Sequence, residues 1–523
     1  MKHLCSFFLS CAVAWFVQSC HEKVLNPNAQ LTLAEYESLD SSAYKLDARK
    51  IWDEINRLAA VDKDSLLPDN RARRHYFKHR SLVWVDRNGV DHRADSVLLR
   101  LRKVTQMGFN PTRFRLPQIE ADLKRLRELD FDDNINSINK VVARLEYNLT
   151  KAYLRYATGQ RFGFVNPAYL LNRYDIYEQD STRRSYRTLY SHRQPRPDEW
   201  FFKRALRMVH VDSVGWFLRQ VEPQGAYYQR LLGILNSDSV SLYGRKLLLT
   251  NLERCRWRLD DTSHDNNKYV LVNIPAFQLQ AVNGAEILTM RVGCGSLETK
   301  TPLLSSEIKR MDVNPQWVIP RSIIKKNIIP RLGNWDYFRS HRYFIRNRVT
   351  GKSVPLEDVT QDMIESGKYA VVQEGGEGNS LGRIIFRFDN DLSIYLHDTS
   401  SKDVFARENR GVSHGCVRVQ YPYELATFLI GNDNTKMLSR IRYSMSADVS
   451  SLGRGRERLS SERLASADTL KRSMLIGSVN VTPKVPVHIV YYTLYPDHEG
   501  RLIRFSDVYG YDVLVYNYLR NYL

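Results

Sequence analysis

The stretch KYVLVNIPAFQLQAVNGAEILTMRVG, residues 268–293, marks the point where the pattern of the chain changes. Apolar and polar residues alternate through it, and Asn283-Gly284 separates two runs, which is the strongest short-range signal for a β-hairpin. Two later pairs of segments, RIIFRF with LSIYLHD and VPVHIVYYTLY with RLIRF, repeat the pattern of strand, turn and strand. We therefore expect residues 266–523 to form a mainly β domain.

Before residue 259 the apolar residues follow the helical period instead. Asp95 is a candidate N-cap for one helix, which Gly108 would end. The apolar face of that helix consists of Val97, Leu98, Leu101 and Val104. A second helix ends near Gly159, and its apolar face consists of Ile138, Val141, Val142, Leu145 and Leu149. We expect residues 46–258 to form an all-helical domain, so that the whole chain belongs to the α+β class.

Composition limits the kind of partner. The chain has 523 residues, 43% of them hydrophobic, and a net charge of +19 from 77 Lys and Arg against 58 Asp and Glu. No interleaving of aromatic and basic residues indicates a nucleic-acid module. We expect anionic cell-wall polymer and lipid headgroups as partners and no nucleic acid, although the charge could equally serve solubility alone.

The start of the chain has the pattern of a signal peptide. The apolar run from residue 4 to 17 is shorter than the ~20 residues that a membrane-spanning helix needs. It leads to Ser19-Cys20, which resembles the lipobox of bacterial lipoproteins, where the cysteine receives a lipid. We expect a lipoprotein signal at residues 1–20, lipidation of Cys20, a polar tether at 21–45 and a periplasmic protein held at a membrane. An ordinary signal peptide is the alternative.

Three cysteines follow Cys20, namely Cys255, Cys294 and Cys416. An odd number in an oxidising compartment leaves at least one free thiol or an intermolecular bond. Cys255 and Cys294 could pair with each other, which the sequence leaves open. Cys416 lies in GVSHGCVRV, residues 411–419, next to a histidine and between short valine-rich runs typical of strands.

A histidine beside Cys416 suits a nucleophilic cysteine, because a thiolate attacks carbonyl groups and a histidine can take the thiol proton. His414 is close to Cys416 in sequence, but the backbone constrains that pair, so we favour His397 as the base. Gly415 would let the backbone expose amides to an oxyanion. Arg418 could hold a carboxylate or orient the loop.

Each feature also has a structural explanation. A free cysteine is often a small buried apolar residue, and Arg418 could simply pair with a surface acid. His397, His414 and Cys416 are also possible zinc ligands, but the motif lacks the paired spacing of zinc sites.

The segment HDTSSKDVFARENRGVSHGCVRV, residues 397–419, closely resembles the signature of YkuD-type L,D-transpeptidase catalytic domains. The matching positions are His397, Ser413, His414, Gly415, Cys416 and Arg418. LERCRWRL, NPQWVIPRSII, LGRIIFRF and DVYGYD are similar to segments of the large murein L,D-transpeptidases of Gram-negative envelopes. HYFKHRSLVWVDRNG and the helices after it resemble the helical scaffold domain of those enzymes.

This resemblance implies acyl transfer on peptidoglycan without metal or organic cofactor. Cys416 would form a thioester with the third residue of a tetrapeptide stem, and the amine of a second stem, usually of diaminopimelate, would resolve it. His397 would be the base, oriented by a carbonyl or by Asp398. The amides of His414, Gly415 and Cys416 would stabilise the oxyanion. Residues on the substrate side would be Arg418, Ser413 and Asp398.

The resemblance also implies a lid, which we expect at about 321–378, and acylation by carbapenems. Large members of the family often carry a separate peptidoglycan-binding module, for which the short link between Asn236 and Gly244 leaves no room. The basic stretch at about 448–475 has no counterpart, and we expect a disordered surface insertion. Two other functions remain open: hydrolysis of the same thioester by an L,D-carboxypeptidase or endopeptidase, and a structural wall-binding lipoprotein with an idle site.

Overall fold

The computed structural model describes residues 45–79, 81–86, 89–180, 183–192, 197–237, 240–258, 267–449, 469–497 and 499–523. The predicted signal with Cys20, the tether up to residue 44 and most of the basic stretch lie outside these ranges. Across the described ranges, no helix combines the length and the apolar character needed to cross a bilayer.

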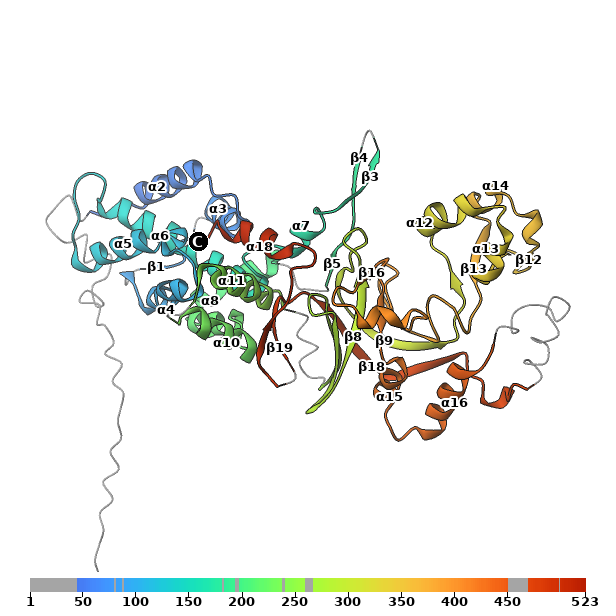
Figure 1. The fold of residues 1–523 in the computed structure, drawn as a ribbon. Coiled ribbons are helices and arrows are strands. Elements are labelled where there is room, and N and C mark those ends of the chain that lie inside the picture. The colour runs from blue at the N-terminus through green and yellow to red at the C-terminus, as the bar shows by residue number, and fades with distance from the viewer. Residues whose placement is uncertain are drawn as a thin grey trace, which may run out of the picture. The chain divides into compact units, whose positions relative to one another are not determined.

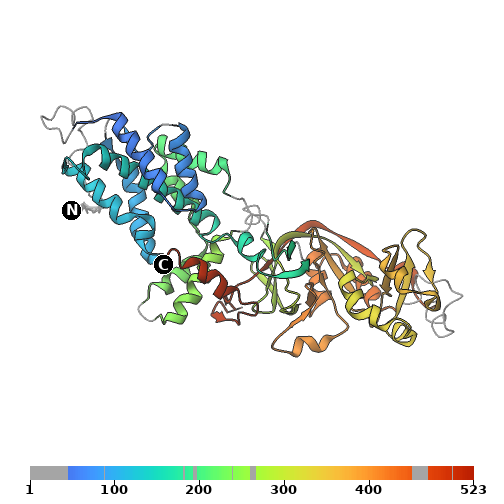
Figure 2. The ribbon, with the colours of Figure 1, turned by 90° about the horizontal axis from the view of Figure 1, so that it is seen from above.

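The chain forms two compact units, and the first is built from helices. It takes residues up to 105, 110–157 and 199–220. Its main elements are α2 (Ala48–Val61), α3 (Leu67–His79), β1 (Val85–Asp86), β2 (Gly89–Val90), α4 (His92–Arg102), α5 (Leu116–Glu128), most of α6 (Ile138–Phe162), α8 (Glu199–His210) and most of α9 (Val214–Val221). Figure 2 shows α2 to α6, in blue and cyan, gathered into one bundle.

The two predicted helices exist, but both predicted boundaries of the first are wrong. This helix, α4, ends at Arg102 and not at Gly108, and a short 3-10 helix (Lys103–Met107) lies between. The N-cap of α4 is Asp91, whose side chain accepts a hydrogen bond from the Arg93 amide at 2.9 Å. Asp95 lies inside the first turn, where a carboxylate also suits the helix dipole, and it pairs with Arg127 at 2.7 Å. Both predicted apolar faces are buried. The second helix, α6, continues past Gly159 to Phe162.

The second unit takes residues 106–109, 158–198 and 221–523. The part of the chain that we expected to be all-helical therefore contributes to it, and that part also contains strands. From this part come α7 (Pro167–Leu171), β3 (Ile176–Asp180), β4 (Arg183–Tyr186), β5 (Tyr190–Ser191), α10 (Ala226–Leu235) and α11 (Leu242–Arg256). β3 and β4 form a hairpin (Figure 1), and β5 adds to the edge of the large sheet beside β9 (Leu303–Val313). Such short strands carry too little periodicity to be seen in sequence.

A large sheet is the framework of the second unit. Its strand order is β14-β15-β17-β8-β7-β6-β18-β9-β5, with β16 beside β8, and β14 also pairs with β9, so that the sheet closes on itself. The remaining strands are β6 (Lys268–Asn273), β7 (Gln278–Asn283), β8 (Glu286–Gly295), β14 (Ile384–Phe388), β15 (Leu396–His397), β16 (Gly411–Ser413), β17 (Val417–Val419) and β18 (Ser478–Val490).

The predicted hairpin at residues 283 and 284 is confirmed. β7 and β8 pair in antiparallel register, with Asn283 opposite Glu286 across a two-residue turn, and Gly284 has φ +60°. The inward side chains of the sheet are fully buried, among them Val270, Val272, Leu279, Ala281, Val292, Ile308 and Val487. Burial of this size stabilises a fold by ~1.5–3 kcal/mol for each large aliphatic side chain, which gives the sheet a rigid core.

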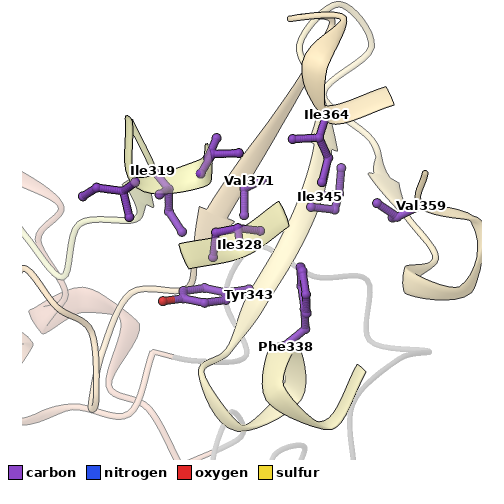
Figure 3. Close-up of a cluster of buried hydrophobic side chains, with 10 residues drawn as sticks. Ile319, Ile328, Phe338, Tyr343, Ile345, Val359, Ile364 and Val371 are labelled. Atoms are coloured by element: carbon purple, nitrogen blue, oxygen red, sulfur yellow. The ribbon is translucent and has the colours of Figure 1, made fainter. Parts of the chain in front are cut away.

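A small sheet with its own core lies in the segment predicted as a lid. Its strand order is β10 (Trp317–Val318), β13 (Tyr369–Gln373), β11 (Tyr343–Asn347) and β12 (Ser353–Val354). Short helices, α12 (Arg321–Ile323), α13 (Trp335–Ser340) and α14 (Gln361–Glu365), accompany these strands. Figure 3 shows the buried cluster that joins them, in which Phe338 and Ile345 are fully buried. We call residues 317–373 the small-sheet subdomain.

The rest of the unit follows the catalytic motif. α15 (Pro422–Ile430) begins with proline in its first turn and has Gly431 as its C-cap. α16 (Thr435–Ser446), the hairpin of β19 (Leu494–Pro496) with β20 (Leu502–Arg504), and α18 (Tyr511–Leu519) complete it. In the predicted third hairpin, β18 does not take part, and β19 pairs with β20 instead.

Candidate active site

Cys416 lies in a loop between two short strands, and the neighbouring strand brings His397 beside this loop. β17 pairs in parallel with β15, so that His397 is opposite Arg418, and the Val417 amide donates to the Tyr395 carbonyl at 3.1 Å. Residues two apart in a strand point to one face, and paired residues share that face. Tyr395, His397, Cys416 and Arg418 are therefore presented on the same side of the sheet.

His397 is held as a neutral ring. It is buried, and burial followed by the charge of Arg418 lowers its pKa to about 4. Its Nδ1 forms a hydrogen bond with the carbonyl oxygen of Asp398. A carbonyl only accepts, so Nδ1 carries the proton and Nε2 keeps a free electron pair. Of the two predicted ways of orienting this ring, the structure has the carbonyl and not the Asp398 carboxylate.

Cys416 rests as a thiol. Burial raises its pKa to about 11, although the neighbouring Tyr395 and Arg418 both favour the thiolate. Its Sγ donates to the carbonyl oxygen of Ser393 at 3.6 Å, and Ser393 has the unusual φ of +55°. With a neutral imidazole on the same face, the site must move the thiol proton during attack, since no thiolate is present beforehand.

The loop before the sulfur is shaped by Gly415. Its φ is +116°, and a Cβ there would lie 3.3 Å from Ile394. We expected the Gly415 amide to donate to an oxyanion, but it donates to Ser413 Oγ at 3.1 Å instead. The amides of His414 and Cys416 have no acceptor among the residues that the structure describes. The His414 side chain is exposed, and its pKa is lowered by partial desolvation and by the charges of Lys326 and Arg418.

Two residues predicted to bind substrate instead hold the site together. Ser413 is buried, and its hydroxyl donates to the Cys416 carbonyl at 2.5 Å. The Asp398 carboxylate is also buried, where it accepts from the Arg383 amide at 2.8 Å and from Lys402. Buried polar groups with satisfied hydrogen bonds are not available to a ligand, so we withdraw the assignment of both as substrate contacts.

Arg418 remains a candidate for binding an anion. Its Nε is buried and has no hydrogen-bond partner within the described part of the chain. Burial lowers the pKa of its guanidinium, with the nearby Asp403 and Arg407 acting in opposite directions. A desolvated guanidinium without a carboxylate bound to it is suited to a carboxylate brought by a ligand.

Comparison with known families identifies the domain that carries this geometry. Residues 267–437 match the L,D-transpeptidase catalytic domain named YkuD, and residues 70–235 match the Scaffold domain. The chain carries a YkuD-type L,D-transpeptidase catalytic domain. A Haemophilus influenzae protein called "Putative L,D-transpeptidase" is 28% identical over 353 residues, which cover 65% of this chain and 64% of that protein. This chain thus aligns with less than two thirds of the relative's length.

The other cysteines of the L,D-transpeptidase domain and its neighbouring helix are inert. Cys255 and Cys294 are free, so the pairing left open by the sequence does not occur. Burial raises the pKa of each to about 12. The described residues contain no group of His, Cys, Asp and Glu arranged to hold a metal ion.

Sequence reasoning missed Tyr395 and a loop that supports the nucleophile. Tyr395 lies two residues before His397, so the period of a strand could have placed it on the same face. Its ring centroid lies 5.9 Å from that of His397. The supporting loop, residues 295–301, is more than a hundred residues away in sequence, and no local pattern connects it to Cys416.

Proposed function

We propose that the protein is a peptidoglycan L,D-transpeptidase that cross-links the third residues of two stem peptides through a thioester on Cys416. The observation that carries this proposal is the common face of Cys416, His397 and Arg418. The amides of His414 and Cys416, beside the sulfur, have no acceptor in the described part of the chain. The match of residues 267–437 to the L,D-transpeptidase catalytic domain supports the class of reaction.

In the first half-reaction, Cys416 attacks the carbonyl carbon of the third residue of a tetrapeptide stem. His397 Nε2 takes the thiol proton as the S–C bond forms, because Nδ1 is already occupied by a carbonyl. The carbonyl oxygen becomes an oxyanion, which the amides of His414 and Cys416 can receive. The bond to the terminal D-alanine then breaks, and His397 returns the proton to the leaving amine.

In the second half-reaction, an amine of diaminopimelate on another stem attacks the thioester. His397 takes a proton from this amine, the C–S bond breaks, and the sulfur leaves with that proton as a thiol. The raised pKa of Cys416 makes the thiol the stable product of this step. Arg418 would hold a carboxylate of one stem, in keeping with its buried Nε, which has no hydrogen-bond partner among the described residues.

The small-sheet subdomain would act as the lid. Lys326 belongs to it and is near enough to His414 to lower the pKa of that ring, and Lys326 Nζ lies 3.8 Å from Glu298. Trp317 of this subdomain and Cys416 both lie near enough to the Tyr395 hydroxyl to change its pKa. A cover at this place would keep water from the thioester and so favour the amine over hydrolysis.

We also propose that the enzyme is a periplasmic lipoprotein anchored through Cys20. This rests on the residues of the leader alone, the apolar run and Ser19-Cys20. An anchor of this kind would hold the catalytic domain near the wall polymer. The net charge of +19 would favour the same location, since peptidoglycan stems and many lipid headgroups carry negative charge.

Product analysis with purified disaccharide-tetrapeptide tests this function. Transfer gives a dimer cross-linked between third residues, together with free D-alanine. Release of a tripeptide monomer without dimer would identify hydrolysis as the main activity. Unchanged substrate, with protein that is folded and has a titratable Cys416, would contradict the proposal and favour a structural role.

A further inference from the structure

The loop from Gly295 to Thr301, which we call the support loop, holds the nucleophile loop by its carbonyl groups. Thr299 Oγ1 donates to the Ser413 carbonyl at 2.7 Å, and Thr301 Oγ1 donates to the Gly415 carbonyl at 2.8 Å. The Ser296 amide also donates to the Ser413 carbonyl, at 3.0 Å. The two threonine hydroxyls therefore bind alternate peptide units of the segment that ends at the sulfur.

Because a peptide unit is planar, these contacts to carbonyl groups also fix the direction of two amide N–H groups. In a planar trans peptide the C=O and the N–H of one unit point in opposite directions. The carbonyl of Ser413 shares its plane with the amide of His414, and the carbonyl of Gly415 shares its plane with the amide of Cys416. Fixing each carbonyl on a threonine consequently fixes the direction of the amide on the other side.

These are the same two amides that lack acceptors in the described part of the chain. The amide between them, that of Gly415, points elsewhere and is taken by Ser413 Oγ. We propose that Thr299 and Thr301 are positioning residues that aim the amides of His414 and Cys416 at the oxyanion. This inference rests on the proposed acyl transfer through Cys416.

The support loop is itself fixed. Thr301 is fully buried, and its hydroxyl oxygen accepts from the Gly295 amide at 2.8 Å while its hydrogen goes to Gly415. Tyr509 clamps both ends, because its hydroxyl donates to the Gly295 carbonyl at 2.7 Å and accepts from the Thr301 amide at 3.1 Å. A Cβ on residue 295 would lie 2.0 Å from the Thr299 carbonyl oxygen, so only glycine fits there.

A buried ion pair holds the loop from the other side. Lys300 lies between the two threonines in sequence, and its Nζ is 2.8 Å from both carboxylate oxygens of Asp175. The same Nζ donates to the Leu297 carbonyl at 2.9 Å. The Lys300 and Asp175 side chains are 6% and 16% exposed, so neither solvent nor salt screens this pair strongly. The hydroxyls of the threonines are thus set in place before any substrate arrives.

The expected loss of acylation rate depends on how much the two amides stabilise the oxyanion. Loss of one oxyanion donor slows acyl transfer by ~10²–10³-fold. Thr301→Val keeps the Cys416 amide but frees its direction, so we expect a loss of about 10–100-fold. In Thr299→Val the Ser296 amide still holds the Ser413 carbonyl, so we expect a smaller loss of about 3–10-fold. The loss should appear in steps that build an oxyanion and not in steps that need only the sulfur.

The test compares two reactions of Cys416 in the full-length protein. A carbapenem acylates the sulfur through an oxyanion, whereas iodoacetamide alkylates it by displacement at carbon, without one. Thr301→Val should acylate at least about 10-fold more slowly than wild type and Thr299→Val about 3–10-fold more slowly, while both variants alkylate within about twofold of wild type. Thr301→Ser, which keeps the hydroxyl, should acylate close to the wild-type rate. Thr250→Val is the matched control, because Thr250 is buried and donates to the Leu247 carbonyl in α11.

Wild-type acylation by both valine variants would overturn the proposal, and so would acylation and alkylation that fall together, since that indicates a general loss of structure. If Thr301→Val does not fold, the same two rates in Thr299→Val decide. A wild-type protein that is alkylated but never acylated would refute the proposed function itself. Equal rates of acylation in the wild type and in both valine variants would refute only the role of the threonines.

Discussion

His397 lies directly opposite Arg418 where β15 pairs with β17, and Arg418 is two residues after Cys416 in the sequence. Burial, together with the positive charge of Arg418, lowers the pKa of the His397 imidazole to about 4 and so keeps it neutral. The strand pairing thus provides a base that is ready to accept a proton throughout the neutral pH range.

The first prediction separates the two histidines. His397→Ala should slow acylation of Cys416 by ~10²–10⁴-fold, the usual contribution of a general base. His414→Ala removes an exposed side chain but keeps the backbone amide, so its loss should be smaller than 10-fold. Time-resolved mass spectrometry of the acyl-enzyme measures both. Equal rates in the His397 variant and in wild type would remove His397 from the mechanism.

A second prediction concerns pH. Because the pKa of His397 is about 4, the rate of acylation should be flat between pH 5 and 8, without the inflection near 6.5 of an ordinary histidine. The neutral ring also stabilises the fold fully above pH 6.5, and this contribution is lost as the pH falls toward 4. Stopped-flow acylation at constant ionic strength measures the profile. A rise centred between pH 6 and 7 would contradict a neutral resting ring.

Alkylation by iodoacetamide provides the third prediction, because it reports the thiolate of Cys416. The rate should increase steadily from pH 7, with its midpoint near pH 11, where the pKa of this thiol lies. Cys416→Ala shows how much of the signal comes from Cys255 and Cys294, which burial protects. A plateau already reached at pH 7 would mean that the site holds a preformed thiolate.

The small-sheet subdomain is the subject of the fourth prediction. Phe338 is fully buried in its core, so Phe338→Ala should destabilise this subdomain by ~3–5 kcal/mol. If the subdomain covers the thioester, tripeptide product should increase relative to dimer, since water gains access. Hydrogen exchange of β11 and β13 reports the unfolding. Val349→Ala, at a residue 88% exposed, is the control. An unchanged product ratio with faster exchange would rule out a lid at this place.

The sequence predicted the parts of the fold that depend on local pattern. The hairpin at Asn283-Gly284 follows from turn chemistry, and it is present. The boundary at Asp95 could not be decided from sequence, because an acid suits both an N-cap and a first turn.

The site was predictable where one short segment carries it and not where distant segments meet. Cys416, His397 and Arg418 come together because one strand follows the other within the same motif. Ser413 and Asp398 were assigned to substrate because sequence does not reveal burial, and the structure turns both inward. Thr301 donates to the Gly415 carbonyl from a loop that is 114 residues away in sequence, so only the folded chain brings the two residues together.

The measurement that tests the account most directly is the site of acylation by a carbapenem. Intact-protein mass spectrometry should show one added drug mass, and peptide mapping should place it on Cys416. Cys416→Ala should show none, and Cys416→Ser should show much less, because its hydroxyl has a far higher pKa than a thiol. Cys255 and Cys294 should stay unmodified, because desolvation raises the pKa of each free thiol to about 12, with Cys294 buried and Cys255 half-buried. An adduct that persists in Cys416→Ala, or no adduct on the wild-type protein at millimolar drug and neutral pH, would contradict Cys416 as the nucleophile.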